Sequence, residues 1–255
     1  KTQPDSYDQT HSFSDVAHWI IPGALMVGRY PYVEPSRCTN REVGEKQMQD
    51  LLGRGGVRRF VCLQGELPPQ EQMPVGGVRG FLPYRPTATL IAAALSGPPS
   101  LEVMEGLRNP HLDAFLPPRR KADRHAQDAN HLGAEAERLR VDLGFAYRPL
   151  SDMEVPQTTR EIRDIVDEEM APFLMAKKDS GNSEGGGGGV VYLHCWGGRG
   201  RAGMVAAATL ARLYDLPADE VLARVDRALK TREPEGRAPQ TDEQIEFVRQ
   251  FVREL

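Results

Sequence analysis

Apolar residues along the chain follow two periodicities, which together predict strands and helices that alternate. Short apolar runs predict strands, and apolar residues spaced by three and four predict amphipathic helices. The predicted strands span residues 25–27, 57–63, 145–149 and 190–193. The predicted helices span residues 41–52, 131–143, 158–174, 204–213 and 216–229, and a last helix starts near residue 241. This alternation indicates an α/β fold in which helices flank a mostly parallel central sheet.

Two segments interrupt this alternation. Between about residues 68 and 127, repeated prolines and glycines are expected to break any regular element, apart from a short apolar run at 89–95. This proline-rich segment is either a solvated loop insertion, which we favour, or a lid or partner-docking segment beside a functional site. Residues 177–189 form a glycine-rich linker that ends in five consecutive glycines at 185–189. We expect a single domain over residues 1–255 that carries both segments.

Composition and charge exclude some classes of protein. The formal net charge of −4 gives no reason to expect nucleic-acid binding, which favours basic patches. The three cysteines, Cys38, Cys62 and Cys195, show no metal-binding or disulfide spacing, which favours a reducing compartment. The longest apolar run, at 90–95, is too short to span a bilayer. We therefore expect a cytoplasmic or nuclear protein without stable membrane insertion. Because the sequence begins at Lys1, an N-terminal leader that has been removed stays an open alternative.

The most informative stretch joins the predicted strand at 190–193 to the following helix. It begins with His194 and Cys195 and ends with Arg201. The five residues between the cysteine and the arginine are Trp196, Gly197, Gly198, Arg199 and Gly200. A glycine-rich turn between a strand and a helix points backbone N–H groups at one place, at the positive end of the helix dipole. The sequence therefore predicts a binding site for a tetrahedral anion.

The side chains of this loop indicate the chemistry. N–H donors and a nearby guanidinium stabilise the thiolate of Cys195, which is the nucleophilic form. Arg201 can donate two parallel hydrogen bonds to two phosphate oxygens. His194 can hydrogen-bond the loop and influence the thiol. These groups predict attack on phosphorus and a cysteinyl-phosphate intermediate. The simplest alternative is a buried structural cysteine beside a glycine turn.

The loop resembles the signature of a known enzyme superfamily. A His-Cys pair, five residues and an arginine are similar to the signature loop of the cysteine-dependent protein tyrosine phosphatases. The loop looks most like the dual-specificity branch, and within it the kinase-associated, cyclin-dependent-kinase-inhibitor-3-like group. Residues 19–31 and 62–67 are also similar to that group. The resemblance excludes residues 68–127 and the glycine linker. It implies a phosphatase-type P-loop at the carboxyl end of the central strand.

The resemblance also assigns roles to residues. Cys195 would be the nucleophile and Arg201 the phosphate clamp, and the backbone of residues 196–200 would bind the substrate. Asp152, in a loop after a predicted strand, matches the family's general acid, which protonates the leaving oxygen and then activates water. Glu154 is a rival for this role, and we favour Asp152. The substrate would be a protein that carries phosphotyrosine, phosphoserine or phosphothreonine, and no metal or organic cofactor is implied.

One departure from the family pattern keeps alternatives open. The family usually has Ser or Thr directly after the arginine, where this chain has Ala202. That hydroxyl stabilises the departing thiolate in the family, so its loss predicts slow breakdown of the intermediate, or a phosphate-binding pseudophosphatase with low turnover. Arg199 in the loop suggests a phosphoinositide or inositol phosphate phosphatase as a further alternative. A sulfurtransferase would also use a loop cysteine, although it requires neither Asp152 nor this spacing.

Two further patterns each allow two interpretations. Cys62 is either a buried small apolar residue or a resolving cysteine that forms a reversible disulfide with Cys195 under oxidation. Thr241 and Gln244 form a potential capping box at the start of the last helix. The same Pro-Gln-Thr-x-x-Gln pattern is similar to the segment that supports the hydrolytic water in the superfamily. These two roles of Gln244 do not exclude each other.

Overall fold

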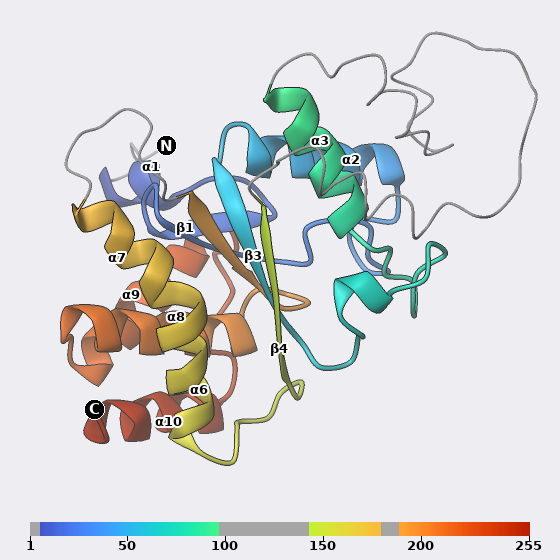
Figure 1. Ribbon diagram of the computed structural model, residues 1–255. Helices are drawn as coiled ribbons and strands as arrows, with labels where there is room; N and C mark the ends of the chain where they lie inside the picture. The colour runs from blue at the N-terminus through green and yellow to red at the C-terminus, as the bar shows by residue number, and fades with distance from the viewer. Residues whose placement is uncertain (1–5, 97–142, 180–188) are drawn as a thin grey trace, which may run out of the picture.

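The computed structural model describes residues 6–96, 143–179 and 189–255 and contains a five-stranded sheet (Figure 1). The strands are β1 (Ala17–Ile21), β2 (Leu25–Gly28), β3 (Val57–Gln64), β4 (Gly144–Leu150) and β5 (Val190–His194), in the order β1-β2-β5-β3-β4. All neighbours pair in parallel except β1 and β2. The predicted α/β fold with a mostly parallel sheet is therefore confirmed, and the cysteine loop lies at the carboxyl end of the central strand.

Helices cover both faces of this sheet (Figure 1). The helices of one layer are α2 (Arg41–Leu52) and α3 (Arg85–Leu95). The other layer contains α6 (Thr159–Ile165), α7 (Ala171–Asp179), α8 (Gly200–Tyr214), α9 (Ala218–Lys230) and α10 (Asp242–Arg253). In β5, Val191 and Leu193 pack into one core and Val190 and Tyr192 into the other. Burial on both faces explains why this strand is an unbroken apolar run.

The edge strand β1 and the short helix α1 (Ser6–His11) were not predicted. A turn at Pro22-Gly23 connects β1 to β2, and Gly23 adopts a φ of +71°. None of the helices among the described residues is both long and apolar enough to cross a membrane.

Helix α3 corrects the prediction that residues 68–127 contain no regular element. Pro86 lies in the first turn, where backbone N–H groups have no partner within the helix, so a proline there costs no hydrogen bond. Ala88, Ile91 and Ala92 are buried in the core that α2 also lines. A short 3₁₀ turn, Gln70–Gln72, also lies in this segment. Residues 97–127, most of the helix predicted at 131–143 and most of the glycine linker lie outside the described residues.

The helix predicted at 158–174 forms, but with an interruption. Its capping box between Thr158 and Glu161 is present, and a π turn at Val166–Met170 separates α6 from α7. Glu169, which lies within this turn, is buried and paired with Arg59 and Arg148. A π turn adds a residue to the helical repeat, so its side chains point in other directions than they would in an unbroken α-helix.

Candidate active site

The loop between β5 and α8 is a tight turn that encloses the Cys195 thiol. Cys195 is 3% exposed, and its Sγ accepts a hydrogen bond from the backbone N–H of Gly198 at 3.3 Å. Gly198 has a φ of +68°, and a Cβ there would lie 2.3 Å from the carbonyl oxygen of Gly28. Only glycine therefore fits at this position. The turn brings a buried thiol to the start of α8, where the helix dipole favours negative charge.

Arg201 lies in the first turn of α8, with its side chain only 1% exposed. Its Nη1 and Nη2 donate to the two carboxylate oxygens of Glu66 at 2.5 and 3.0 Å, and Nη1 also donates to the carbonyl oxygen of Leu150 at 3.2 Å. Its Nε has no hydrogen-bond partner among the described residues. Burial disfavours the charge, but the hydrogen bonds with Glu66 and the charges of Cys195 and Asp152 raise the pKa of Arg201. The guanidinium is fixed in position and has one free donor.

Glu66 is a residue of the site to which the sequence analysis gave no role. It lies just after β3, next to the central strand. Burial favours its neutral form, but the hydrogen bonds from Arg201 outweigh burial and lower the pKa of Glu66. The signal that could have identified it is its place in the run 62–67, directly after a predicted strand. Because parallel neighbouring strands end at the same edge of the sheet, an acid at that position lies near the cysteine loop.

Asp152 is brought to the loop as the sequence analysis expected. Its Oδ1 lies 2.8 Å from Nη2 of Arg201, and its side chain is 54% exposed. Met153 follows with a φ of +60°, a strained conformation for this residue. Glu154 contributes its carbonyl oxygen, which accepts a hydrogen bond from Gln244 at 3.4 Å. Of the two candidate acids, Asp152 is the one whose carboxylate contacts Arg201.

A second buried arginine, which the sequence analysis did not identify, donates hydrogen bonds to the backbone of the loop. Arg232 donates to the carbonyl oxygens of Gly197 and Gly198 at 3.0 and 3.3 Å, and its side chain is fully buried. Burial and the nearby Arg29 lower the pKa of Arg232 to about 10, so it is still charged at neutral pH. Because these two carbonyls point toward Arg232, the loop does not present them to an anion bound beside Cys195.

His194 contacts the loop, as expected, and is held in its neutral form. Its Nδ1 lies 3.4 Å from the carbonyl oxygen of Cys195, and its Nε2 lies 2.9 Å from the hydroxyl of Tyr84. Complete burial lowers the pKa of His194 to about 3. Tyr84 comes from the segment expected to be an insertion, so that segment contributes directly to the surroundings of the site.

The capping box at the start of α10 is confirmed. The Thr241 hydroxyl accepts from the N–H of Gln244, and the side chain of Gln244 accepts from the N–H of Thr241. Gln244 is also close to the loop, because a Cβ at Gly200 would lie 2.9 Å from its Oε1. Its role toward a hydrolytic water stays a prediction.

Cys62 is a free, buried thiol on β3, directly opposite His194 on β5. Burial raises the pKa of Cys62 to about 12, so the sulfur behaves as a small apolar group. Its register places it beside the residue that precedes Cys195. If it is a resolving cysteine, mild peroxide should produce a Cys62–Cys195 disulfide that mass spectrometry of peptides detects. Oxidation of Cys195 to sulfinic acid without this crosslink would contradict the resolving role.

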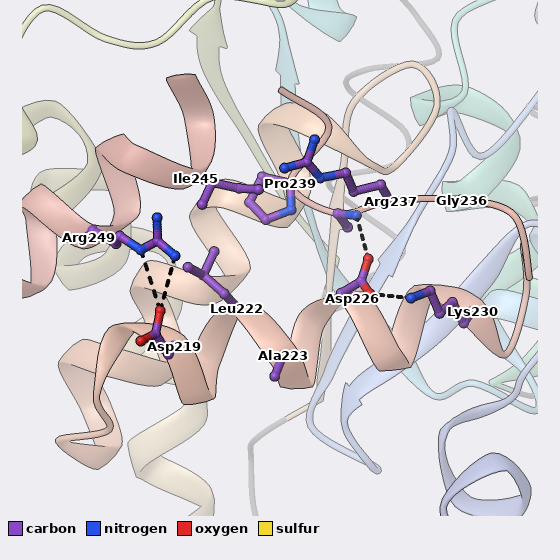
Figure 2. Close-up of a pocket in the computed structure, with 11 residues that line it drawn as sticks. Asp219, Leu222, Ala223, Asp226, Lys230, Gly236, Arg237, Pro239, Ile245 and Arg249 are labelled. Carbon is purple, nitrogen blue, oxygen red and sulfur yellow. Dashed lines mark hydrogen bonds and ion pairs between the residues drawn. The ribbon is translucent and has the colours of Figure 1, made fainter. Parts of the chain in front are cut away.

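A surface hollow beside α9 is separate from this loop (Figure 2). Its lining includes the pairs Arg249–Asp219 and Lys230–Asp226, at 3.2 and 2.6 Å, around Leu222 and Ile245. None of its lining residues belongs to the loop at 195–201. Within the part of the chain that the structure describes, no group of three or more His, Cys, Asp or Glu side chains is placed to hold a metal ion.

Comparison with known proteins gives similarity at the level of solved structures. No family model matches the chain, and no curated protein matches it. The chain is similar to Tk-PTP in its active form, at 17% identity over 94% of this chain and 98% of that one, with a TM-score of 0.47. It is also similar to PTPMT1 in complex with PI(5)P, at 14% identity over 93% and 95% of the two chains, with a TM-score of 0.46.

A third similar structure is the kinase associated phosphatase with its catalytic-site cysteine replaced by serine. The identity is 14% over 91% of this chain and 86% of that one, and the TM-score is 0.46. Identities and TM-scores this low do not assign a function, so we base the functional proposal on the contacts of the loop.

Proposed function

We propose that this protein hydrolyses phosphomonoesters through a cysteinyl-phosphate intermediate, in the manner of the dual-specificity phosphatases. The observation that supports this most is the Nε–H of Arg201, a buried donor that has no partner among the residues the structure describes and lies beside the buried thiol of Cys195. A buried N–H that makes no hydrogen bond destabilises the protein, so such donors are rare unless a ligand accepts from them. A phosphate in the loop would accept from this donor.

The proposed reaction has two steps. The Cys195 thiolate attacks phosphorus, the P–S bond forms, and the ester P–O bond breaks as Asp152 gives its proton to the leaving oxygen. Water then attacks phosphorus, Asp152 takes a proton from it, and the P–S bond breaks to regenerate the thiolate. Arg201 and the N–H groups of residues 196–200 would stabilise the charge that develops on the phosphoryl oxygens.

Glu66 would act as the positioning residue for Arg201. It binds both Nη atoms of the guanidinium and leaves Nε free. The orientation of the clamp is therefore set before substrate binds, which lowers the cost of organising the transition state. Asp152, held at Nη2, would be close to the ester oxygen of a phosphate bound by this arginine.

The Ala202 position predicts which step limits turnover. Rapid mixing of p-nitrophenyl phosphate with the natural protein should give a burst of nitrophenol followed by slow turnover, because no hydroxyl at this position assists the departing thiolate. Ala202 is fully buried and serine adds a single oxygen, so Ala202→Ser should raise the slow rate about 10-fold with an unchanged burst rate. A natural protein that shows no burst, and whose steady rate Ala202→Ser leaves unchanged, would contradict a slow second step.

A phosphate-binding module with little turnover is the second candidate, and Ala202 is the observation that favours it. This binding module predicts saturable phosphopeptide binding without phosphate release.

If the protein is an enzyme, we propose phosphorylated proteins as its substrates. Faster release from phosphoinositides than from phosphopeptides would instead support the lipid alternative suggested by Arg199.

A further inference from the structure

The loop that holds Cys195 has two chemically different sides. Strand β5 lies between β2 and β3, so the segment after β2 flanks the loop on one side and the segments after β3 and β4 flank it on the other (Figure 1). Arg201 contacts Glu66 and Asp152 on the β3–β4 side. Trp196, directly after the cysteine, contacts Glu34 and Tyr30 of the segment after β2, and its ring also meets Phe81 of the segment after β3. An ester bound at Cys195 would therefore extend outward between Asp152 and Trp196.

The indole of Trp196 is fixed in place although it is partly exposed. Its Nε1–H donates to Oε2 of Glu34 at 3.0 Å, and its ring meets Phe81 edge to face at a centroid distance of 5.3 Å. Its carbonyl oxygen accepts from the N–H of Tyr30 at 3.0 Å. The residue is still 36% exposed, so part of it is open to solvent.

Glu34, the acceptor for this indole, is buried and accepts several other hydrogen bonds. It is 3% exposed, and its carboxylate also accepts from the N–H and hydroxyl of Ser36 and from the N–H of Arg37, at 2.6 to 2.8 Å. Burial raises the pKa of Glu34, but these hydrogen bonds outweigh burial and lower it overall, so the side chain is an anion at neutral pH. A buried carboxylate with four donors fixes the direction of the Trp196 ring.

We propose that Trp196 determines specificity, as a fixed aromatic wall that contacts the organic group of the ester, with Glu34 as its positioning residue. A flat aryl group, such as the side chain of phosphotyrosine, would pack against the indole, whereas a polyol phosphate would lose hydration without gaining an equivalent contact. This inference rests on the proposed function, because it places the phosphoryl group in the loop. It narrows the preferred substrate to aryl phosphomonoesters.

Binding without chemistry tests this directly. In protein that carries Cys195→Ser, calorimetric titration should show that Trp196→Ala weakens binding of phenyl phosphate about 10-fold, the size expected for one aromatic contact. Binding of inorganic phosphate and of glycerol 2-phosphate should change less than about 2-fold. Glu34→Ala should weaken phenyl phosphate selectively as well, by about 3-fold, because the ring loses its fixed direction.

The second tryptophan provides both a control and a second measurement. Trp19 packs against Phe13 on the edge strand β1. Trp19→Phe should leave all affinities unchanged and make Trp196 the only indole fluorophore of the chain. In Trp19→Phe/Cys195→Ser, phenyl phosphate should then change Trp196 emission far more than inorganic phosphate does. This measurement keeps the native Trp196 and does not depend on the folding of the Trp196→Ala variant.

Two results would overturn the proposal. Equal weakening of phenyl phosphate and inorganic phosphate by Trp196→Ala would mean that the indole only supports the loop. The second result is that an inositol phosphate binds more tightly than phenyl phosphate and depends on Trp196 to the same degree. Trp196 would then favour a polyol phosphate over an aryl phosphate. If inorganic phosphate itself fails to bind, the proposed function fails, and this result is distinct from a loss of aryl preference alone.

Discussion

Replacing Cys195 by serine should lower the rate of aryl phosphate hydrolysis by on the order of 10⁴-fold or more. A serine hydroxyl is almost wholly protonated at neutral pH, and no described contact of this side chain supplies a base that would activate it: the contact to its sulfur is the donor N–H of Gly198. Because the burst reports formation of the intermediate, the variant should lose the burst as well as the steady rate. Stopped-flow release of nitrophenol measures both.

Cys38 offers a matched control for this substitution. It is also a free, buried cysteine, but its Sγ contacts the carbonyl oxygen of Asn40 outside the loop. Cys38→Ser should therefore retain the burst and the steady rate. Inorganic phosphate should still bind to the Cys195→Ser protein, because Arg201 and the loop backbone remain. Residual Cys195→Ser activity above about 1% of the natural rate would exclude Cys195 as the nucleophile.

The parts of the site that are local in the sequence could be predicted, together with most of the sheet. Cys195 and Arg201 belong to one turn between a strand and a helix, so their spacing already determines that they lie near each other. The four predicted strands occur with ends that differ by at most one residue from the prediction. The apolar runs of β2, β3 and β5 are largely buried, and burial is the property that a hydrophobic pattern reports, whereas the edge strand β4 is mostly half-buried.

The contacts that orient the loop could not be predicted in this way. Glu66 is 135 residues from Arg201, Tyr84 is 110 residues from His194, and Arg232 is 35 residues from Gly197. A hydrophobic pattern shows that a segment is buried but not which strands are neighbours. The order β2-β5-β3-β4 determines that Glu66 and Asp152 reach the same arginine. Asp152 was identified only because the resemblance supplied a role for an acid after a strand.

Proline content misled the prediction for residues 85–95. The prolines of this segment predict broken helices, but Pro86 occupies the first turn of a helix, where proline is favourable. The consequence concerns the site, because Phe81 and Tyr84, which precede α3, pack beside Trp196 and His194. The described part of the proline-rich segment therefore belongs to the wall of the candidate site rather than to a detached loop.

Arg201→Lys should lower kcat/KM for an aryl phosphate by about 10² to 10³-fold, the loss typical of one transition-state donor. The planar guanidinium donates to both carboxylate oxygens of Glu66 and still directs its Nε–H at a bound phosphate. The single nitrogen of a lysine ammonium cannot make all of these contacts in the same geometry. The loss should appear in kcat as well as KM, since charge on the phosphoryl oxygens is redistributed in the transition state. Steady-state kinetics, with calorimetric titration of inorganic phosphate, measures both effects.

Glu66→Gln separates the orientation of the clamp from its charge. The amide replaces one of the two acceptor oxygens by an NH2 donor, so the guanidinium keeps its charge but loses its bidentate support, and kcat should fall about 10-fold with phosphate binding largely retained. Arg237→Lys, at an exposed ion pair with Asp242, controls for arginine replacement as such and should have no effect. If Arg201→Lys binds phosphate and turns over as the natural protein does, the free Nε–H of Arg201 does not mark a phosphate site, and the proposed function loses its strongest support.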